Sequence, residues 1–336
     1  MIRTITITLL ALLCLLTAND LRAQDPIFSQ FYAAPLQINP AFAGNTYTPR
    51  IALNYRNQWN GWEGLPYQTY AASYDQFFEE LNVGFGLLAL TDDAGNGLFQ
   101  INKLGAFFSY KVKVNDEFNL KLGVEAGAWQ TRVGWDQLIF GDQIDRVDGS
   151  TDGMLTEELI PDDDSKTVFD VSAGLLAYGP KFYGGISLKH INTPNDSHLA
   201  IEENVIGGLP IRFSFHGGSQ ITLREGNSRR LSTFISPNIL FENQSDLSQL
   251  NIGTYAGLGP VFAGAWFRHT FGNSDAVIFL VGYRQKALKI GYSYDLTVSD
   301  PLATLNTGGT HEISIGLNFD HNRRKVNYED CFQLFR

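Results

Sequence analysis

The residues best suited to chemistry gather in one acid-rich stretch, Arg132 to Thr167. Its aspartates and glutamates include positions 142, 145, 148, 152, 157, 158 and 162–164. Carboxylate oxygens are the ligands that calcium prefers, but an EF-hand loop needs them at fixed positions around a glycine. The spacing does not follow that pattern. We therefore favour a solvated loop over a calcium site.

The histidines and the cysteines give no catalytic or metal-binding pattern. The six histidines are scattered singly, and neither H-E-x-x-H nor G-x-S-x-G occurs. His311 and Glu312 form the one neighbouring pair that an embedded hydrolase could use, but a histidine at a rim or in a loop explains His311 equally well. We predict a non-enzymatic protein with no catalytic residues, no cofactor and no metal site.

The first residues have the pattern of a secretory signal peptide. Arg3 is followed by the apolar run Leu9–Leu16 and by a small residue, Ala23, after which we expect cleavage. The mature chain then keeps one cysteine, Cys331, which excludes an internal disulfide. The formal charge of −10 argues against a nucleic-acid partner, because such partners require a basic surface.

The elements that must position any site are strands, because hydrophobicity alternates with period two. In Leu288–Asp295 and in Glu312–Phe319, apolar residues alternate with polar or small ones. About fourteen such segments are expected within the usual boundary error. Their ranges are 50–57, 69–78, 81–91, 98–110, 117–131, 168–178, 181–190, 211–223, 230–240, 250–257, 261–268, 276–286, 288–296 and 310–319.

The connections between these segments alternate between long and short. We expect long connections at 58–68, 92–97, 132–167, 191–210, 241–249, 269–275 and 297–309, with short turns between them, including the REGNSRR stretch at 224–230. Short turns on one side and long loops on the other are typical of a transmembrane barrel. A soluble sandwich or jelly roll would also alternate, but the signal peptide, the sorted loops and the excess of aromatic residues (24 Phe, 14 Tyr and 5 Trp) together argue against it.

The predicted fold is therefore all-β, a transmembrane antiparallel up-and-down β-barrel in the outer membrane. We expect a signal peptide at 1–23, an N-terminal capping segment at 24–49, the barrel at 50–319 and a periplasmic tail at 320–336. Lipid then contacts the apolar faces, and the polar faces turn toward the lumen.

Four stretches resemble the PorP/SprF family of outer-membrane proteins linked to type IX secretion in Bacteroidetes. They are QDPIFSQFYAAPLQINPAFAG (24–44), YRNQW with the following Gly and Pro (55–66), YQTYAASYDQ (67–76) and KIGYSYDLTVSDPLATLNTGGTHEISIGLNF (289–319). The family begins its mature chain with F-S-Q-Y/F and N-P-A-x-A-G. It closes with G-Y-S-Y-D and G-G-T-H-E-I-S-L.

The resemblance implies a barrel without catalysis that assists type IX secretion. Its implied partners are a secreted surface protein or adhesin with a type IX sorting domain, and periplasmic peptidoglycan-linked or other type IX components. A role in gliding motility occurs in the family. The alternative is a passive outer-membrane porin or uptake channel.

The segment before the first strand is too apolar for a solvated tail and too rich in proline for a long helix. It starts on the periplasmic side, and we expect it to fold against the barrel mouth or lumen with Phe31, Phe42 and its other aromatics buried. It either caps the barrel or docks a partner, and capping is favoured. The residues assigned to this role are Phe28, Gln30, Tyr32, Asn39, Pro40 and Gly44.

A second candidate site lies on the outer loops 58–68 and 191–210. Aromatic residues dominate protein contacts, although the same residues could form the interfacial girdle of a barrel. This candidate partner surface consists of Trp59, Trp62, Tyr67, Pro194, Leu209 and Pro210.

Overall fold

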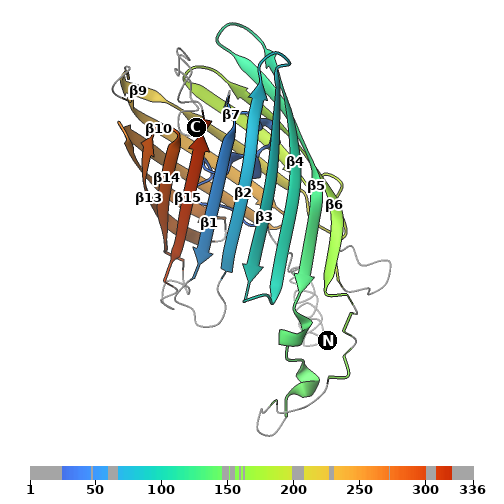
Figure 1. The fold of residues 1–336 in the computed structure, drawn as a ribbon. Coiled ribbons are helices and arrows are strands. Elements are labelled where there is room, and N and C mark those ends of the chain that lie inside the picture. Colours follow the sequence, from blue (N-terminus) through green and yellow to red (C-terminus); the bar gives the residue numbers. More distant parts are fainter. Residues whose placement is uncertain are drawn as a thin grey trace, which may run out of the picture.

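The chain forms a closed antiparallel β-barrel (Figure 1). The computed structural model describes residues 25–46, 48–59, 67–145, 151, 156–158, 160–161, 163–198, 208–226, 231–271, 273–299 and 308–319. Strands adjacent in sequence pair with each other, and the first pairs with the last from Arg50–Asn318 to Gln58–Thr310. The predicted up-and-down barrel is confirmed.

The wall is built from strands of 8 to 15 residues, apart from one short piece of 4 residues. The strands are β1 (Arg50–Gln58), β2 (Tyr67–Phe78), β3 (Val83–Ala94), β4 (Phe99–Lys113), β5 (Asn119–Val133), β6 (Ser165–Tyr178), β7 (Phe182–Lys189), β8 (Arg212–Ser219), β9 (Ile221–Arg224), β10 (Thr233–Gln244), β11 (Leu247–Leu258), β12 (Val261–Thr270), β13 (Asn273–Gln285), β14 (Leu288–Thr297) and β15 (Thr310–Asn318).

Strands β8 and β9 are two halves of one strand. Both pair with β10, and only Gln220 separates them. The shared register places Ser219 opposite Pro237, which has no N–H to donate to the ladder. Counting β8 and β9 as one, fourteen strands cross the wall, as the sequence predicts.

Three connections differ from the prediction. β10 and β11 are joined by residues 245–246 alone, and β12 and β13 by residues 271–272, so the long loops expected there are wrong. The strands continue through Glu242 and Gln249, which point into the lumen and are buried. Polar residues of that kind are also typical of loops, and for that reason the sequence pattern predicted a loop here. Conversely, the REGNSRR region belongs to an eight-residue connection between Arg224 and Thr233.

Exposure alternates along most of the wall in the opposite sense to that of a water-soluble protein. On β5, Lys121 and Glu125 are 2% and 1% exposed, whereas Leu122 and Val124 are 50% and 52% exposed. Polar residues thus face the interior and apolar residues face outward, as a barrel in lipid requires.

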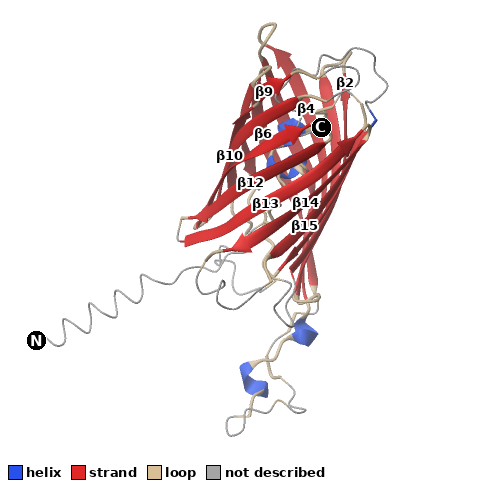
Figure 2. Ribbon diagram, turned by 90° about the vertical axis from the view of Figure 1, so that its left-hand side faces the viewer, coloured by secondary structure: helices blue, strands red, loops and turns tan. Residues whose placement is uncertain are grey.

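The two mouths of the barrel differ. Connections 59–66, 134–164, 190–211 and 298–309 lie at one end, which we call the long-loop mouth. The other end, the short-turn mouth, carries 79–82, 114–118, 179–181 and 286–287. Two 3-10 turns, η2 (Trp135–Gln137) and η3 (Gly141–Gln143), extend beyond the long-loop mouth, at the bottom of Figure 2.

The described part of the chain has no helix with the length and hydrophobicity to span a bilayer.

Candidate functional site

The lumen is occupied by the N-terminal segment, residues 25–46, which we call the plug. It contains α2 (Pro35–Ile38) and η1 (Pro40–Phe42), visible inside the barrel in Figure 2. Two of its aromatic side chains, Phe31 and Phe42, are 3% and 0% exposed, and the side chains of Phe28 and Tyr32 are buried as well. All four lie inside, as expected from the sequence.

Local sequence explains the fold of the plug. Pro35 and Pro40 each occupy a first helical turn, where the missing N–H costs nothing. The Asn39 side chain accepts a hydrogen bond from Ala41 N at 2.8 Å and so caps η1. Gly44 has φ +62°, and a Cβ there would lie 2.6 Å from Gly84 Cα, so only glycine fits.

The plug runs through the whole lumen. At the long-loop mouth, Asp25 N donates to the side chain of Gln244, the last residue of β10, at 3.0 Å. At the short-turn mouth, Thr46 O accepts from Phe77 N, next to the β2–β3 turn, at 3.2 Å. The sequence predicts that this segment starts on the periplasmic, short-turn side, and for its first residues that prediction is wrong. Asp25 lies at the long-loop mouth because its partners are there, and only the C-terminal end of the plug lies at the short-turn mouth.

Polar contacts hold the plug at Ser29 and Gln30. Glu312 accepts the backbone N–H groups of both residues at 2.8 Å each. The Ser29 hydroxyl donates to Asp295 Oδ2 at 2.6 Å, and the Gln30 carboxamide donates to Ser293 Oγ at 3.2 Å. Two consecutive backbone donors on one carboxylate make a specific, charge-assisted grip on the chain.

Two arginines complete this site, which we call the Ser29 anchor. Arg56 Nη1 lies 3.1 Å from Glu312 Oε2, and Arg268 Nη1 lies 3.0 Å from Asp295 Oδ2. Both arginines also contact the Ser29 hydroxyl. The four charged side chains come from β1, β12, β14 and β15 and are 0–8% exposed. Buried charges require such partners, and the plug supplies part of them.

A second buried network, the Asp25 anchor, holds the first residue of the plug. His190 Nε2 lies 2.9 Å from Asp25 Oδ2, and His190 Nδ1 lies 2.9 Å from Asp170 Oδ1. Arg212 donates to Asp25 at 3.2 Å and also pairs with Glu242. The histidine therefore bridges a plug carboxylate and a wall carboxylate.

The contacts of the Asp25 anchor shift two titrations in opposite directions. Burial alone would lower the pKa of His190, but the carboxylates of Asp25 and Asp170 outweigh it and raise that pKa to about 9. Burial alone would raise the pKa of Asp25, yet His190 and Arg212 hold it well below its usual value.

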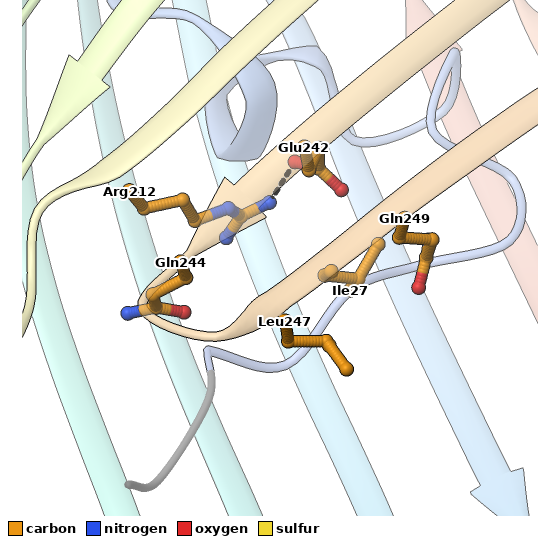
Figure 3. A pocket seen from close by; sticks show the side chains of 6 residues that line it. All are labelled: Ile27, Arg212, Glu242, Gln244, Leu247 and Gln249. Atoms are coloured by element: carbon orange, nitrogen blue, oxygen red, sulfur yellow. Dashed lines mark hydrogen bonds and ion pairs between the residues drawn. The ribbon is translucent and has the colours of Figure 1, made fainter. Parts of the chain in front are cut away.

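A small pocket lies beside this anchor. It has a volume of about 10 Å³, room for at most one water molecule. Its lining, drawn in Figure 3, is Ile27, Arg212, Glu242, Gln244, Leu247 and Gln249. It is therefore a packing defect near the long-loop mouth and too small for an organic ligand.

The middle of the plug rests on wall glycines. A Cβ at Gly84, Gly123 or Gly174 would come within 2.1, 2.2 or 2.0 Å of Ala43 O, Ala41 N or the Asn39 side chain. These strand positions lack side chains because the plug occupies that space. Asn39 Nδ2 also donates to Leu175 O and Ile186 O at 3.0 Å each. The plug and the wall are thus complementary in shape as well as in charge.

All six residues assigned to the capping or docking segment lie inside the lumen. Phe28, Gln30, Tyr32 and Asn39 are at most 3% exposed, and Pro40 and Gly44 are buried. Arg56, Asp295 and Glu312, which bind the plug, were missed as site residues. Each lies in one of the sequence stretches that carry the family resemblance, which was a usable signal.

His311 and Glu312 do not form a working pair. They are consecutive residues of β15, so their side chains point to opposite faces of the wall. Glu312 faces the lumen, whereas His311 Nδ1 lies 2.8 Å from the hydroxyl of Tyr292, a residue that is 40% exposed.

The candidate outer-loop surface is only partly assembled in the described residues. Trp59 and Tyr67 pack edge to face with ring centroids 5.0 Å apart. Leu209 is 3% exposed and belongs to a buried cluster with Ile101 and Trp129, so placing it on a partner surface was wrong. Pro194 O accepts from Leu209 N at 2.9 Å, and Pro210 follows in the chain. Trp62 lies outside the described residues.

The acidic loop is also described in part. Asp142 accepts hydrogen bonds from Thr156 Oγ1 at 3.0 Å and from Glu157 N, and Arg132 pairs with Asp164 at 2.7 Å. Over the described residues of the chain, no group of three or more His, Cys, Asp or Glu side chains is placed to hold a metal ion. Asp148, Asp152 and Asp162 lie outside those residues, as does the tail with Cys331.

A family model described as "Type IX secretion system membrane protein PorP/SprF" matches residues 21–317. The chain belongs to the PorP/SprF family. The match includes both the plug and nearly all of the barrel wall, so the two parts are features of one family domain. It places the chain among the membrane proteins of the type IX secretion system.

Solved structures similar to this PorP/SprF protein are outer-membrane barrels. The Ralstonia pickettii toluene transporter TbuX is 13% identical, with a TM-score of 0.51, over 85% of this chain and 94% of that chain. The Pseudomonas putida toluene transporter TodX is 9% identical, with a TM-score of 0.45, over 84% and 91%. A mutant Rh. blastica porin is 7% identical, with a TM-score of 0.33, over 81% and 99%.

At 13% identity, the similarity to TbuX shows a shared fold and does not show what this chain binds or transports. No curated protein matches the sequence.

Proposed function

We propose that this PorP/SprF protein is a non-enzymatic outer-membrane barrel that assists the secretion and surface display of a partner protein. The partner is a secreted surface protein, such as a large adhesin with a type IX sorting domain. The barrel acts by binding this partner, and its lumen is not a conduit. The single observation that carries this proposal is the plug, which occupies the lumen from one mouth to the other.

The contacts of the plug support a permanent closure. Its polar groups bind residues of β1, β6, β7, β10, β14 and β15, among others, so it touches the wall all around. Its apolar side chains pack inside too: Tyr32 lies 4.9 Å from Tyr255, and Phe31 lies 4.8 Å from Trp266, ring centre to ring centre. A solute channel would need the plug to move, and any such movement would break contacts of this kind.

The partner would bind at the long-loop mouth. In outer-membrane barrels the long loops face the cell exterior. The loop 134–164 extends from this mouth and carries exposed Ile139 and Ile144 among its acidic residues. Apolar anchors within a polar surround are typical of protein interfaces.

Affinity purification from outer membranes, followed by mass spectrometry, tests the proposal. The tagged wild-type protein should co-purify with a large surface protein. Replacing 138–160 by a short Gly-Ser linker should abolish co-purification, whereas replacing 226–231, on the short-turn side, by a linker should not. Recovery of the same proteins with both variants, or of no surface protein at all with the wild type, would refute the proposal.

The alternative, a passive porin or uptake channel, makes a different prediction in planar bilayers. A plugged barrel should show no steady open conductance, and a variant with the plug displaced should show one. A steady open conductance in the wild-type protein would favour the channel and contradict a closed lumen.

A further inference from the structure

The direction of the plug has a topological consequence. Asp25 contacts Gln244, the last residue of β10, Arg212, the first residue of β8, and His190, which directly follows β7. All three positions are at the long-loop mouth. Ile27 lies beside Leu247, the first residue of β11, at the same level (Figure 3).

The plug fills the lumen between Asp25 and the short-turn mouth. The side chains of Phe31, Tyr32, Leu36 and Phe42 are 0–3% exposed, so the plug itself fills this space. The 22 residues from 25 to 46 reach about 70 Å when extended, whereas the apolar band of such a barrel is about 25 Å tall. The helical turns take up the surplus length.

We propose that the plug presents its N-terminal end, Asp25 to Ile27, through the long-loop mouth on the cell-surface side of the outer membrane. There it forms part of the surface that a secreted polypeptide partner meets, a point that rests on the proposed function. The segment enters from the periplasm during export. In the folded protein its N-terminal end then lies at the cell-surface mouth, and its C-terminal end lies at the periplasmic mouth.

This topology constrains assembly. Because the wall packs closely around residues 25–46, we expect it to close around them during assembly. A short unstructured extension before Asp25 can cross with the segment. A domain that folds in the periplasm cannot, and it should block insertion of the plug.

The test is a ten-residue epitope inserted between Gln24 and Asp25. Two reference proteins carry the same epitope elsewhere: between Gly141 and Asp142, in the outer loop, and between Asp116 and Glu117, in the short turn after β4. On intact cells, antibody should bind the N-terminal epitope and the outer-loop epitope. It should bind the turn epitope only after the outer membrane is permeabilised.

A second variant avoids any insertion. In a Cys331→Ser background, Ile27→Cys should react with a membrane-impermeant maleimide on intact cells, whereas Val114→Cys should not. The proposal is overturned if the N-terminal epitope, or Cys at 27, becomes accessible only together with its short-turn counterpart.

The accessibility measurement does not involve cargo, so the two proposals can fail separately. Surface labelling at position 27 without any co-purifying surface protein would refute the proposed function and leave the topology intact. Co-purification of a partner with labelling only from the periplasmic side would refute the topology alone.

Discussion

Glu312 offers the most direct test of how the plug is held. The substitution Glu312→Gln keeps the size of the side chain and removes its charge. The carboxylate accepts two backbone N–H groups at 2.8 Å and pairs with Arg56 at 3.1 Å, with 0% exposure. A carboxamide has one acceptor oxygen, so its NH₂ group would face at least one of these donors. An NH₂ group cannot accept a hydrogen bond, so at least one of these contacts would be lost.

The expected cost follows from these contacts. Removing one partner of a buried charge pair costs about 3–5 kcal/mol. The burial of Phe28, Phe31, Tyr32 and Phe42 is unchanged, and each such side chain contributes about 1.5–3 kcal/mol. We therefore expect local opening around Ser29 and Gln30 and no complete release of the plug.

Amide hydrogen exchange in detergent micelles measures this opening. The Ser29 and Gln30 amides should exchange roughly 10²–10⁴-fold faster in the variant, since 1.4 kcal/mol corresponds to a factor of ten. The Phe42 amide, bonded to Asn39 O at 3.1 Å, should be unaffected.

Glu158→Gln is the matched control, because Glu158 is exposed in the outer loop. It should leave exchange unchanged at all of these positions. If Ser29 and Gln30 exchange within threefold of the wild-type rate in the Glu312→Gln protein, the assigned role of Glu312 is wrong.

Three further predictions test other parts of the structure. First, attachment at the Asp25 anchor should depend on pH. The raised pKa of His190 stabilises the contact fully below its ordinary value of 6.5, and this contribution is lost as the pH rises through about 9. The lowered pKa of Asp25 contributes above its ordinary value of 3.8 and is lost as the pH falls further. Maleimide labelling of Ile27→Cys, corrected for the intrinsic pH dependence of the thiol, should therefore accelerate above pH 6.5, and the added His190→Gln change should flatten the profile. Second, Gly123→Ala should displace the plug, because its Cβ would lie 2.2 Å from Ala41 N, whereas at Gly316 the nearest atom is 3.7 Å away. Open conductance in the Gly123→Ala protein and none in Gly316→Ala is the expected result; equal traces would contradict it. Third, Leu104→Lys should cost about 2–4 kcal/mol of folding free energy in lipid vesicles, because Leu104 is 64% exposed on the outer face of the barrel wall. Val114→Lys, in the short turn, should cost about 0–1 kcal/mol, and a similar loss for both would argue that Leu104 does not face hydrocarbon.

The sequence alone determined the wall of the barrel. A strand exposes its side chains to two faces in turn, so a barrel in lipid imposes a period of two that can be read residue by residue, as in Leu288–Asp295. Nearly every strand boundary followed from this pattern. The exceptions lie at the β10–β11, β12–β13 and β9–β10 connections. Near Glu242 and Gln249 the prediction failed because polar residues that face a lumen look the same in sequence as polar residues that face water.

Only the tertiary structure decided where the plug lies and what holds it. The composition of residues 28–44 predicted burial, since an uncharged aromatic segment cannot remain in water. Its partners are distant in sequence: Ser29 meets Glu312, and Asp25 meets His190 and Arg212. Closure of the barrel brings these residues together. The alternation of apolar and polar residues shows which side chains face the lumen, but it does not show which of them lie at the same height in it. The direction of the plug depends on those same contacts. It therefore could not be predicted from the sequence alone.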